Sequence, residues 1–401
     1  MAMKQTQTKL FDFSDVGLDF CVGSKSLFPD RFKKMLAIGY NMQTVASVAV
    51  AGNQVTLTYG VSHGYVADRV LKVESGALAS INGGEFWIDS VTSNTLTLTI
   101  DDAPVSVAGA FTTKIASLGW DLVFEQPYIH VYKFKHIDDT DMYIRLCFQN
   151  NPSYRNRVAP CVGRSYDVAT GFITDELALN DTKSIATPNI YAWDFTYDTS
   201  INYNNYTYSQ GVGVFGRAMV IGSAYHFVLM HSKDTNDWFN QGVFPTTSSF
   251  ISVPALICDS YGNPNQGNPY GFSFAGKILL GDNVCISKVT TDTSVFNNFE
   301  TAPQASQSVL PASIENFNTT TAEPVPMYIH ANGQFLGFLM GIYRCKYASN
   351  NAPGISKLLM PLRTTDIDLN SIVYINPITA SGTNIGYATY FAIPVEEIRI
   401  A

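Results

Sequence analysis

Apolar and polar residues alternate over short stretches along most of the chain, which is the pattern of half-buried β-strands. Val55, Leu57 and Tyr59 alternate with threonines, and in residues 95–100 threonines alternate with leucine and isoleucine. Residues 128–148 repeat the alternation with more aromatic side chains on either side of an acidic connection, which predicts an antiparallel hairpin. Short strands joined by turns therefore dominate the predicted structure.

One segment near the start has the period of an amphipathic helix instead. Apolar side chains recur at three- and four-residue steps from Phe28 to Leu36. Pro29 suits the first helical turn, and Gly39 suits the position just past the last turn. We therefore predict one short helix at residues 26–38, with an apolar face that packs against the strands.

The density of strand patterns divides the chain into three parts. Residues 1–44 form an N-terminal segment that carries the helix. Residues 45–115 contain several short strands with almost no helical pattern, which predicts a small inserted β-barrel or β-sandwich module. Residues 116–401 form the main aromatic-rich β domain, which a split near 300–325 would divide into two subdomains. The predicted fold class is mainly β, with antiparallel β-sandwich or β-barrel domains, an inserted all-β module and one short N-terminal helix.

The composition narrows the classes of function. Charged residues make up 14% of the chain, against roughly 25% in an average soluble domain. The 25 Lys and Arg residues face 33 Asp and Glu residues, so the net charge of −8 argues against a nucleic-acid partner. Aromatic residues make up 13%, too many for a disordered chain. An aromatic-rich surface with little charge is typical of subunits that other subunits cover.

The cysteines and the N-terminus indicate the compartment. Six cysteines occur at long spacings without a C-x-x-C pair, so we predict reduced, buried thiols. The first ten residues are polar and lack the apolar core of a signal peptide. The longest strongly apolar stretch, residues 218–230, is shorter than the roughly 20 residues of a membrane helix. We therefore expect synthesis in a cytoplasm, no signal peptide and no membrane insertion.

Three motifs imitate binding or catalytic sites. Residues 211–216 match G-x-G-x-x-G, but no strand-then-helix pattern surrounds them, so we predict a glycine-rich loop or bulge. Residues 271–276 only approximate a nucleophile elbow. Residues 136–141 join a histidine to three aspartates without the rest of a calcium loop, which favours a solvated turn. We predict no catalytic residue, no cofactor and no metal site, although carboxylate pairs for glycoside hydrolysis stay open.

A segment rich in Tyr, Trp and Asn, residues 189–210, is the candidate contact surface. Tyr203, Tyr206 and Tyr208 are interspersed with polar residues, a composition found both in subunit interfaces and where proteins stack on sugars. We predict these tyrosines as contacts with another subunit, and contact with a glycan is the alternative. The period-two aromatic stripe at residues 191–197 is also consistent with plain core.

The hairpin turns have sequence signatures of their own. Asn332 and Gly333 stand between two apolar stretches, and Asn-Gly is the strongest short-range sign of a tight β-hairpin. Both are predicted as structural turn residues.

The inserted module carries the most specific pattern in the chain. It resembles a small β-domain that recurs in structural proteins of tailed bacteriophages. The resemblance rests on QVTLT at 54–58, SHGY at 62–65, DRVLKV at 68–73, INGGEFWIDSV at 81–91 and NTLTLT at 94–99. It implies that His63 and Gly64 are turn residues rather than catalysts. The hairpin at 327–342 and the final strand at 386–393 resemble the C-terminal parts of phage virion proteins.

The resemblance and the composition together predict a structural subunit of a tailed-phage virion, most simply in the tail or baseplate. It would be made in the bacterial host cytoplasm and act by symmetric self-assembly, with further copies and other phage virion proteins as partners. It would not be an enzyme. The alternatives are a receptor- or glycan-binding tail-tip protein that contacts a host-surface glycan, an enzyme such as a glycan-degrading tail protein, and a structural protein of the head or neck.

Overall fold

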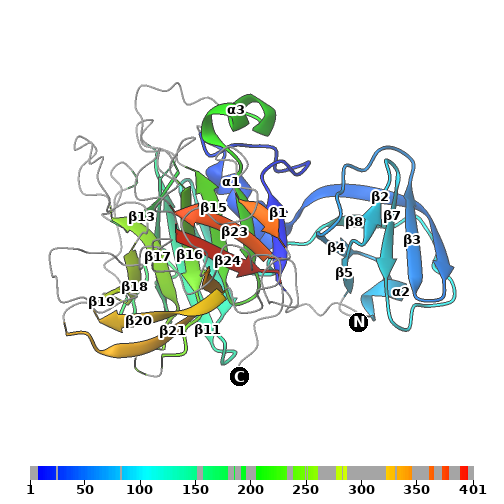
Figure 1. The fold of residues 1–401 in the computed structure, drawn as a ribbon. Coiled ribbons are helices and arrows are strands. Elements are labelled where there is room, and N and C mark those ends of the chain that lie inside the picture. The colour runs from blue at the N-terminus through cyan, green and yellow to red at the C-terminus, as the bar shows by residue number, and fades with distance from the viewer. Residues whose placement is uncertain are drawn as a thin grey trace, which may run out of the picture.

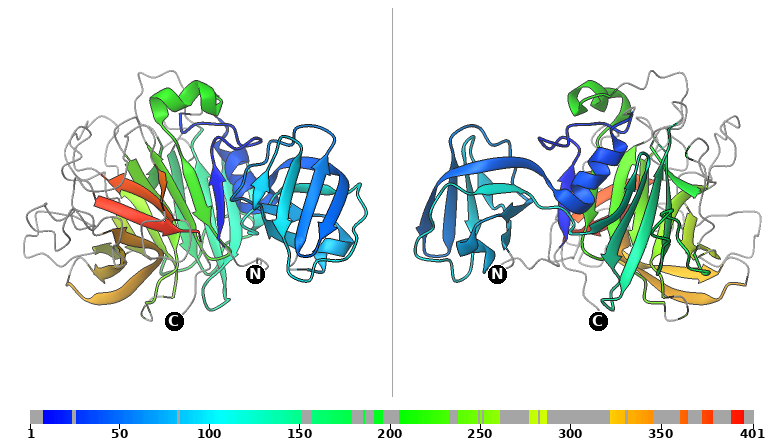
Figure 2. Two further views of the ribbon diagram at one scale, coloured as in Figure 1. Left: turned by 45° about the vertical axis from the view of Figure 1, so that its right-hand side comes forward. Right: turned by 180° about the vertical axis from the view of Figure 1, so that it is seen from behind.

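The computed structural model describes residues 8–23, 26–81, 84–150, 157–178, 185, 191–195, 205–232, 238–248, 250, 252–260, 277–281, 283–286, 322–329, 332–345, 361–364, 373–378 and 389–395. Within this part of the chain the fold is mainly β, with antiparallel strands, few and short helices, and no sheet that closes into a barrel. Two lobes lie side by side, a larger body and a smaller module inserted near the N-terminus (Figure 1; Figure 2). The predicted fold class is confirmed.

The body contains most of the strands and the first and last described residues. Its strands are β1 Lys9–Asp12, β9 Asp121–Gln126, β10 Ile129–Lys135, β11 Asp141–Phe148, β12 Arg157–Gly163, β13 Tyr191–Asp194, β14 Met219–Gly222, β15 Phe227–Ser232, β16 Trp238–Phe244, β17 Ala255–Ser260, β18 Lys277–Leu280, β19 Asn283–Ile286, β20 Ala322–Ile329, β21 Phe335–Cys345, β22 Leu362–Thr364, β23 Val373–Ile378 and β24 Thr389–Pro394. Strands β10 and β11 pair over their whole length, which confirms the hairpin predicted at residues 128–148. The predicted split near 300–325 falls mainly on residues outside the described ones, and β19 and β20 on either side of it pair with each other.

The central strands of the body have apolar side chains on both faces. Phe227 and Leu229 of β15 belong to one core cluster, which includes side chains of β10 and β11. Val228 and Met230 belong to a second cluster, which includes side chains of β20, β21 and β24. Both faces are therefore covered, which explains why β14 and β15 read as continuous apolar runs rather than as alternating patterns.

The predicted helix exists, but it is shorter at its start and irregular at its end. Helix α1 spans Phe28–Lys33 and continues as the π-helical turn η1, Lys34–Ile38. Gly39 ends it with a φ of +76°, a conformation that glycine adopts without strain. Phe32 is fully buried and faces the rings of Phe148, Trp193 and Phe227, with centroids 5.6, 6.1 and 5.6 Å away. The helix therefore fixes the N-terminal segment to the aromatic core of the body.

The inserted module is a seven-stranded antiparallel sheet whose buried apolar side chains belong to the same core cluster as those of the adjoining body. Its strands are β2 Tyr40–Ala51, β3 Gln54–Tyr59, β4 Val70–Val73, β5 Glu85–Trp87, β6 Ser90–Val91, β7 Thr95–Thr99 and β8 Thr112–Ile115, with a single helical turn, α2 Gly76–Ala79. The sheet starts at Tyr40 rather than at residue 45. Strands β2 and β8 enter and leave the module and pair with each other, with Tyr40 opposite Ile115. The connection to the body is thus a paired neck rather than two separate linkers.

The glycine motif at residues 211–216 is not the loop or bulge that the sequence predicts. It lies in helix α3, Tyr208–Phe215, and Gly216 follows as the cap. Thr207 and Gln210 form a capping box at the start of the helix, which supports its first turn. A Cβ on Gly211 would lie 2.2 Å from the Sγ atom of Cys21. The glycine is therefore a packing contact, because it lets the helix approach the N-terminal segment.

Candidate functional site

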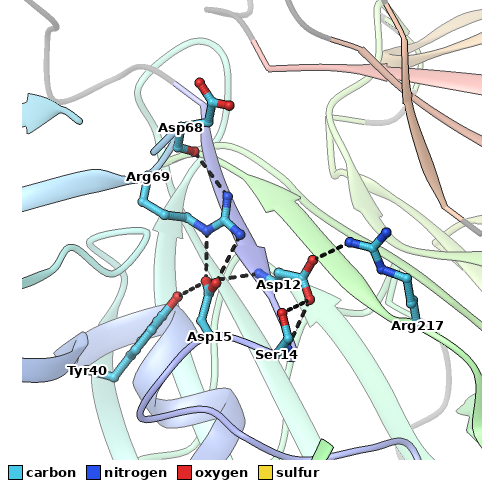
Figure 3. A network of polar contacts seen from close by, with 7 residues as sticks. All are labelled: Asp12, Ser14, Asp15, Tyr40, Asp68, Arg69 and Arg217. Atoms are coloured by element: carbon cyan, nitrogen blue, oxygen red, sulfur yellow. Dashed lines mark hydrogen bonds and ion pairs between the residues drawn. The ribbon is translucent and has the colours of Figure 1, made fainter. Parts of the chain in front are cut away.

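The junction between body and module is built around the carboxylate of Asp15. Arg69 approaches it from the loop before β4 and donates through Nε and Nη2, at 2.8 and 2.9 Å. The hydroxyl of Tyr40, in the neck, donates to the same carboxylate at 2.7 Å, and the backbone N–H of Asp12 donates at 3.1 Å. Asp15 and Arg69 are each only 7% exposed. One buried carboxylate thus joins the body, the neck and the module (Figure 3).

A second carboxylate extends this network on the body side. Asp12, at the end of β1, accepts hydrogen bonds from the backbone N–H and the hydroxyl of Ser14 at 2.9 and 2.8 Å. Arg217, just before β14, donates from Nη2 to the other oxygen of Asp12 at 2.9 Å. The turn after β1 is therefore held in one conformation, which presents Asp15 to the module.

A second buried ion pair crosses the same junction with the opposite polarity. The Nζ atom of Lys9, on β1 of the body, lies 2.7 Å from Oε2 of Glu85 on β5 of the module. Lys9 also donates to the carbonyl oxygen of Ser117, in the segment that leaves the module, at 2.5 Å. The body supplies the cation here and the anion at Asp15. Two such pairs, both buried, fix the orientation of the module more strictly than one pair could.

Burial and charge shift the pKa values of these groups in consistent directions. Burial and the nearby Asp15 carboxylate raise the pKa of Tyr40 well above its ordinary value. Burial opposes the charge of Arg69, but Asp15, helped by Tyr40 and Asp12, outweighs it and raises the pKa of the guanidinium. Burial lowers the pKa of Lys9, partly offset by Glu85. Tyr40 is therefore held as a hydrogen-bond donor and Arg69 as a cation, the states that the geometry requires.

A pocket of about 310 Å³ opens beside the network. Its polar lining includes Asp12, Arg69 and Arg217, and its apolar lining includes Val16 and Val66. Those two valines are 52% and 41% exposed. Pockets of this volume with a few convergent polar groups occur preferentially between domains. The arrangement suits binding rather than chemistry, because the carboxylates of Asp12 and Asp15 are already engaged by arginine.

Besides the junction pocket, the described surface has a group of exposed aromatic side chains at the β20–β21 hairpin. We call Phe250, Phe335 and Phe338 the hairpin aromatic surface; they are 66%, 49% and 39% exposed. The rings of Phe335 and Phe338 contact each other edge to face, with centroids 5.2 Å apart. Thr247, three residues before Phe250, is bonded to Phe338: its N–H donates to the carbonyl oxygen of Phe338 at 3.0 Å, and its hydroxyl accepts from the N–H of Phe338 at 2.8 Å. Clustered exposed aromatic side chains are typical of surfaces that bind other proteins.

A β-bulge brings these two phenylalanines together. Residues three apart in a regular strand point to opposite faces. The register of β21 shifts so that Phe335 pairs with Tyr328 and Gly337 pairs with Met327. Leu336 is thereby an extra, buried residue, and the alternation resumes on the other face after it. The alternation in the sequence gives no sign of this bulge, and the sequence predictions therefore missed the surface.

His63 and Gly64, the predicted turn residues of the module, differ from each other in what they contact. His63 is 1% exposed, and its Nε2 donates to the carbonyl oxygen of Thr95 at 3.1 Å while its Nδ1 accepts from the N–H of Tyr65 at 2.9 Å. Its ring stacks on Tyr65, with centroids 5.1 Å apart. Gly64 has a φ of +67° and packs on Val16 of the body. Both nitrogens of His63 are thus used inside the module, and Gly64 allows a close approach to the body.

Asn332 and Gly333 lie at the end of the β20–β21 hairpin. Gly333 has a φ of +70° and donates from its N–H to the carbonyl oxygen of Ile329 at 2.8 Å. The side chain of Asn332 accepts from the N–H of Gln334 at 3.0 Å. These are the contacts of a turn. The turn fixes where the pairing of β20 with β21 begins, and the bulge at Leu336 lies just beyond it.

The tyrosines predicted as an interface lie beside the N-terminal segment, except Tyr203, which falls outside the described residues. Tyr206 and Tyr208 are half-buried and pack against the core cluster of the body. The backbone N–H of Tyr208 donates to Asp19 at 3.2 Å, and Asn205 accepts from the N–H of Ser26 at 2.8 Å. Contact of these tyrosines with a subunit or a glycan stays a prediction.

Two absences concern the described residues alone. Among them, no three His, Cys, Asp or Glu side chains gather in a way that could hold a metal ion. None of the helices in the described ranges is long and apolar enough to cross a membrane.

The predicted turn at residues 136–141 has Asp138 accepting from the N–H of Thr140 at 3.0 Å. The approximate nucleophile elbow at 271–276 lies outside the described residues.

Two buried histidines predict a loss of stability in acid. Burial lowers the pKa of His226 to about 3 and that of His130 to about 4, whereas in the unfolded chain each titrates near 6.5. As the pH falls below 6.5 the unfolded chain therefore binds protons that the folded chain does not. The free energy of unfolding should fall by about 1.4 kcal/mol per pH unit for each histidine.

Urea denaturation of the wild type and of His226→Gln at pH 7.5, 6.5, 5.5 and 4.5 measures this contribution. Carboxylates titrate in both proteins, so the difference between the two curves isolates the histidine. The variant should lose less stability between pH 6.5 and pH 4.5 than the wild type. Parallel curves would contradict the assignment to His226.

Comparison with known proteins adds little to this geometry. No protein-family model matches the chain, and no curated protein does. A solved structure of the phage phi92 endosialidase is similar with 11% sequence identity and a TM-score of 0.16, over 90% of this chain and 52% of that protein. This chain thus spans about half the length of the matched protein. A TM-score this low carries no argument about fold or function.

Proposed function

We propose that the protein is a structural subunit of a tailed-phage virion that works through contacts with copies of itself and with other virion proteins. The observation that carries the proposal is the hairpin aromatic surface. Phe250, Phe335 and Phe338 expose aromatic area beside a turn made of uncharged residues. Exposure of aromatic surface to water is energetically unfavourable, and aromatic side chains are characteristic of the buried core of an interface.

The fixed orientation of the module relative to the body supports the same proposal. An assembly subunit must present its contact surfaces in a fixed relative orientation, because symmetric closure tolerates little angular error. The pairs Asp15–Arg69 and Lys9–Glu85, together with the paired neck, give the module such an orientation. The module's sequence pattern resembles a β-domain of tailed-phage structural proteins, and on that ground we also propose a position in the tail or baseplate.

The hairpin aromatic surface gives the proposal a direct test. We expect the double substitution Phe335→Ser and Phe338→Ser to reduce incorporation into virions at least about tenfold, because aromatic anchors dominate interface energies. The protein should still fold, since both side chains are partly exposed in the free chain. The measurement is quantitative mass spectrometry of virions purified from cells in which the variant replaces the wild-type chain.

Val168→Ser is the matched control, because Val168 is 77% exposed in a different part of the body. Circular dichroism and the melting temperature of each purified variant check that it folds. Absence of the wild-type chain from purified virions would refute the proposed function. Incorporation of the double variant at the level of the control would show that this surface is not the contact.

A further inference from the structure

The second half of β2, in the module, has a stretch of sheet edge to which no described strand is bonded. Strand β8 pairs with one side of β2 over residues 40–44, and β3 pairs with the other side over residues 45–51 (Figure 1). Just before β8, the N–H of Ala110 donates to the carbonyl oxygen of Val45 at 2.9 Å, and Gly109 lies against the carbonyl oxygen of Ala46. On that side, β8 and the residues before it thus cover the edge as far as Ala46.

The ladder between β2 and β3 decides which groups of β2 face this edge. In an antiparallel sheet, alternate residues of a strand bond to the neighbours on its two sides. The N–H of Tyr59, on β3, donates to the carbonyl oxygen of Asn94, just before β7, at 2.8 Å. Odd-numbered residues of β3 therefore bond on the β7 side and even-numbered ones on the β2 side. The residues of β2 that bond to β3 are the partners of those even-numbered residues, Ser47, Ala49 and Ala51.

Val48 and Val50 consequently direct their N–H and C=O groups to the edge that β3 does not occupy. Within the described ranges, no backbone group donates to them or accepts from them on that side. Their side chains are partly buried against the core cluster, so they lie on the inner face of the sheet. Two donors and two acceptors are available here to another strand, and sheet edges of this kind are ready templates for pairing with a second chain.

The chain protects a different edge and leaves this one unprotected. Strand β20 pairs with β19 at Tyr328 and Ile329, and its earlier part contains Glu323, Pro324 and Pro326. Proline lacks the N–H that a partner strand needs, and charged residues at an edge discourage pairing. Strands β2 and β3 contain no charged residue and no proline. Nothing in the sequence of β2 therefore opposes pairing at its edge.

The residues of this edge fit a second copy of the same strand. Residues 47–51 are Ser-Val-Ala-Val-Ala, which is nearly symmetric about Ala49. In an antiparallel pair centred on Ala49, Val48 of each copy lies opposite Val50 of the other, and these residues exchange N–H···O=C hydrogen bonds. Valine then faces valine on the inner face, and small side chains face small ones on the outer face. Because the net charge of the chain is −8, two copies approach most easily through an uncharged segment.

We propose that the chain dimerises through the module, with β2 of one copy paired antiparallel to β2 of a second copy about a two-fold axis at Ala49. The contact joins the two modules into one continuous sheet, and it closes as a dimer because both copies use the same surface. It also removes the remaining exposed area of Val48 and Val50 from water. The dimer goes beyond the proposed function and does not rest on it, because it uses the module, whereas the hairpin aromatic surface lies on the body.

Sedimentation velocity of the full chain over a range of concentrations tests the dimer. We expect the wild type to dimerise, and Ala49→Lys to weaken the dimer at least about tenfold, because two like charges then face each other across the axis. Ala49 is exposed, so the new side chain does not enter the core. Thr99→Lys, at an exposed position on β7, is the control, and circular dichroism checks the folding of both variants. A wild type that stays monomeric, or equal dimerisation of the two variants, would overturn the proposal.

A mixing experiment tests the two-fold axis. Ala49→Lys and Ala49→Glu should each be monomeric where the wild type dimerises, and an equimolar mixture should recover the dimer, because opposite charges then meet at the axis. A contact in which Ala49 meets another part of the second copy gives no such recovery, so a monomeric mixture would refute the pairing. The double variant Phe335→Ser and Phe338→Ser should dimerise like the wild type. Loss of the dimer in that variant would place the contact on the body and contradict the proposal.

Discussion

Replacing Arg69 with alanine is expected to lower the free energy of unfolding by about 3–5 kcal/mol. The substitution leaves the carboxylate of Asp15 buried, with one side-chain donor, Tyr40, and one backbone donor, the N–H of Asp12. A buried charge without its counter-charge is among the most destabilising changes a protein can undergo. Urea denaturation of the purified variant measures the loss, and hydrogen exchange should locate it at the neck and in the loop before β4.

An exposed ion pair provides the control. The Nζ atom of Lys135 lies 2.6 Å from Oδ1 of Asp141, and the two side chains are 45% and 37% exposed. Lys135→Ala should therefore cost no more than about 1 kcal/mol. If Arg69→Ala costs no more than this control, the junction pair does not hold the module.

A second variant separates the charge from the packing. Asp15→Asn combined with Arg69→Met removes both charges, keeps an acceptor for Tyr40 and fills most of the volume. Replacement of a whole buried ion pair by uncharged groups is often close to neutral. The double variant should recover most of the stability that Arg69→Ala loses. Equal loss in both variants would mean that the shape of Arg69, and not its charge, matters at this position.

Phe32→Ala is expected to destabilise the body by about 3–5 kcal/mol. The side chain is fully buried, and its ring lies within 5.6–6.2 Å, centroid to centroid, of the rings of five aromatic residues: Phe28, Phe148, Trp193, Phe195 and Phe227. Truncation leaves a cavity where α1 meets the sheets, and the rigid aromatic neighbours fill it poorly. Thermal and urea denaturation of the variant measure the loss.

Phe250→Ala is the matched control for the loss of a phenyl ring. Phe250 is 66% exposed, so its truncation should change the free energy of unfolding by less than about 0.5 kcal/mol. Both side chains are aromatic, but only one is part of the core. Similar losses for the two variants would contradict the role assigned to Phe32.

The sequence predicted the strands where a single face is buried and the period-two pattern is regular. Residues 54–59 and 95–99 form β3 and β7 as their alternation indicates. The apolar periodicity was a weaker guide to secondary structure where the backbone departs from regular helix or strand geometry. The π-helical end of the N-terminal helix follows from packing, which no local periodicity records. The helix at residues 208–215 has a local sign, the Thr207-x-x-Gln210 capping box, but no apolar period that would predict its length. In α3 a close contact with Cys21, rather than a glycine loop, accounts for Gly211.

The candidate site could not be predicted in the same way, because its residues are distant in sequence. Asp15 and Arg69, and likewise Lys9 and Glu85, come from different lobes. The spacing Asp12-x-Ser14 is a sign of a local turn, and it could have marked the segment as structured. Nothing local indicates that the turn presents Asp15 to a module loop, since only the insertion of the module brings the two together.

By itself, the sequence determined that the chain is mainly β, that it contains an inserted all-β module, and that its surface has little charge for its size. These follow from local periodicity and composition, which act over a few residues. Only the tertiary structure decided which side chains share a site. Two buried ion pairs of opposite polarity orient the module, and a one-residue bulge turns Phe335 and Phe338 to the same face. Both depend on the register and placement of distant segments, which the packing of the whole chain sets.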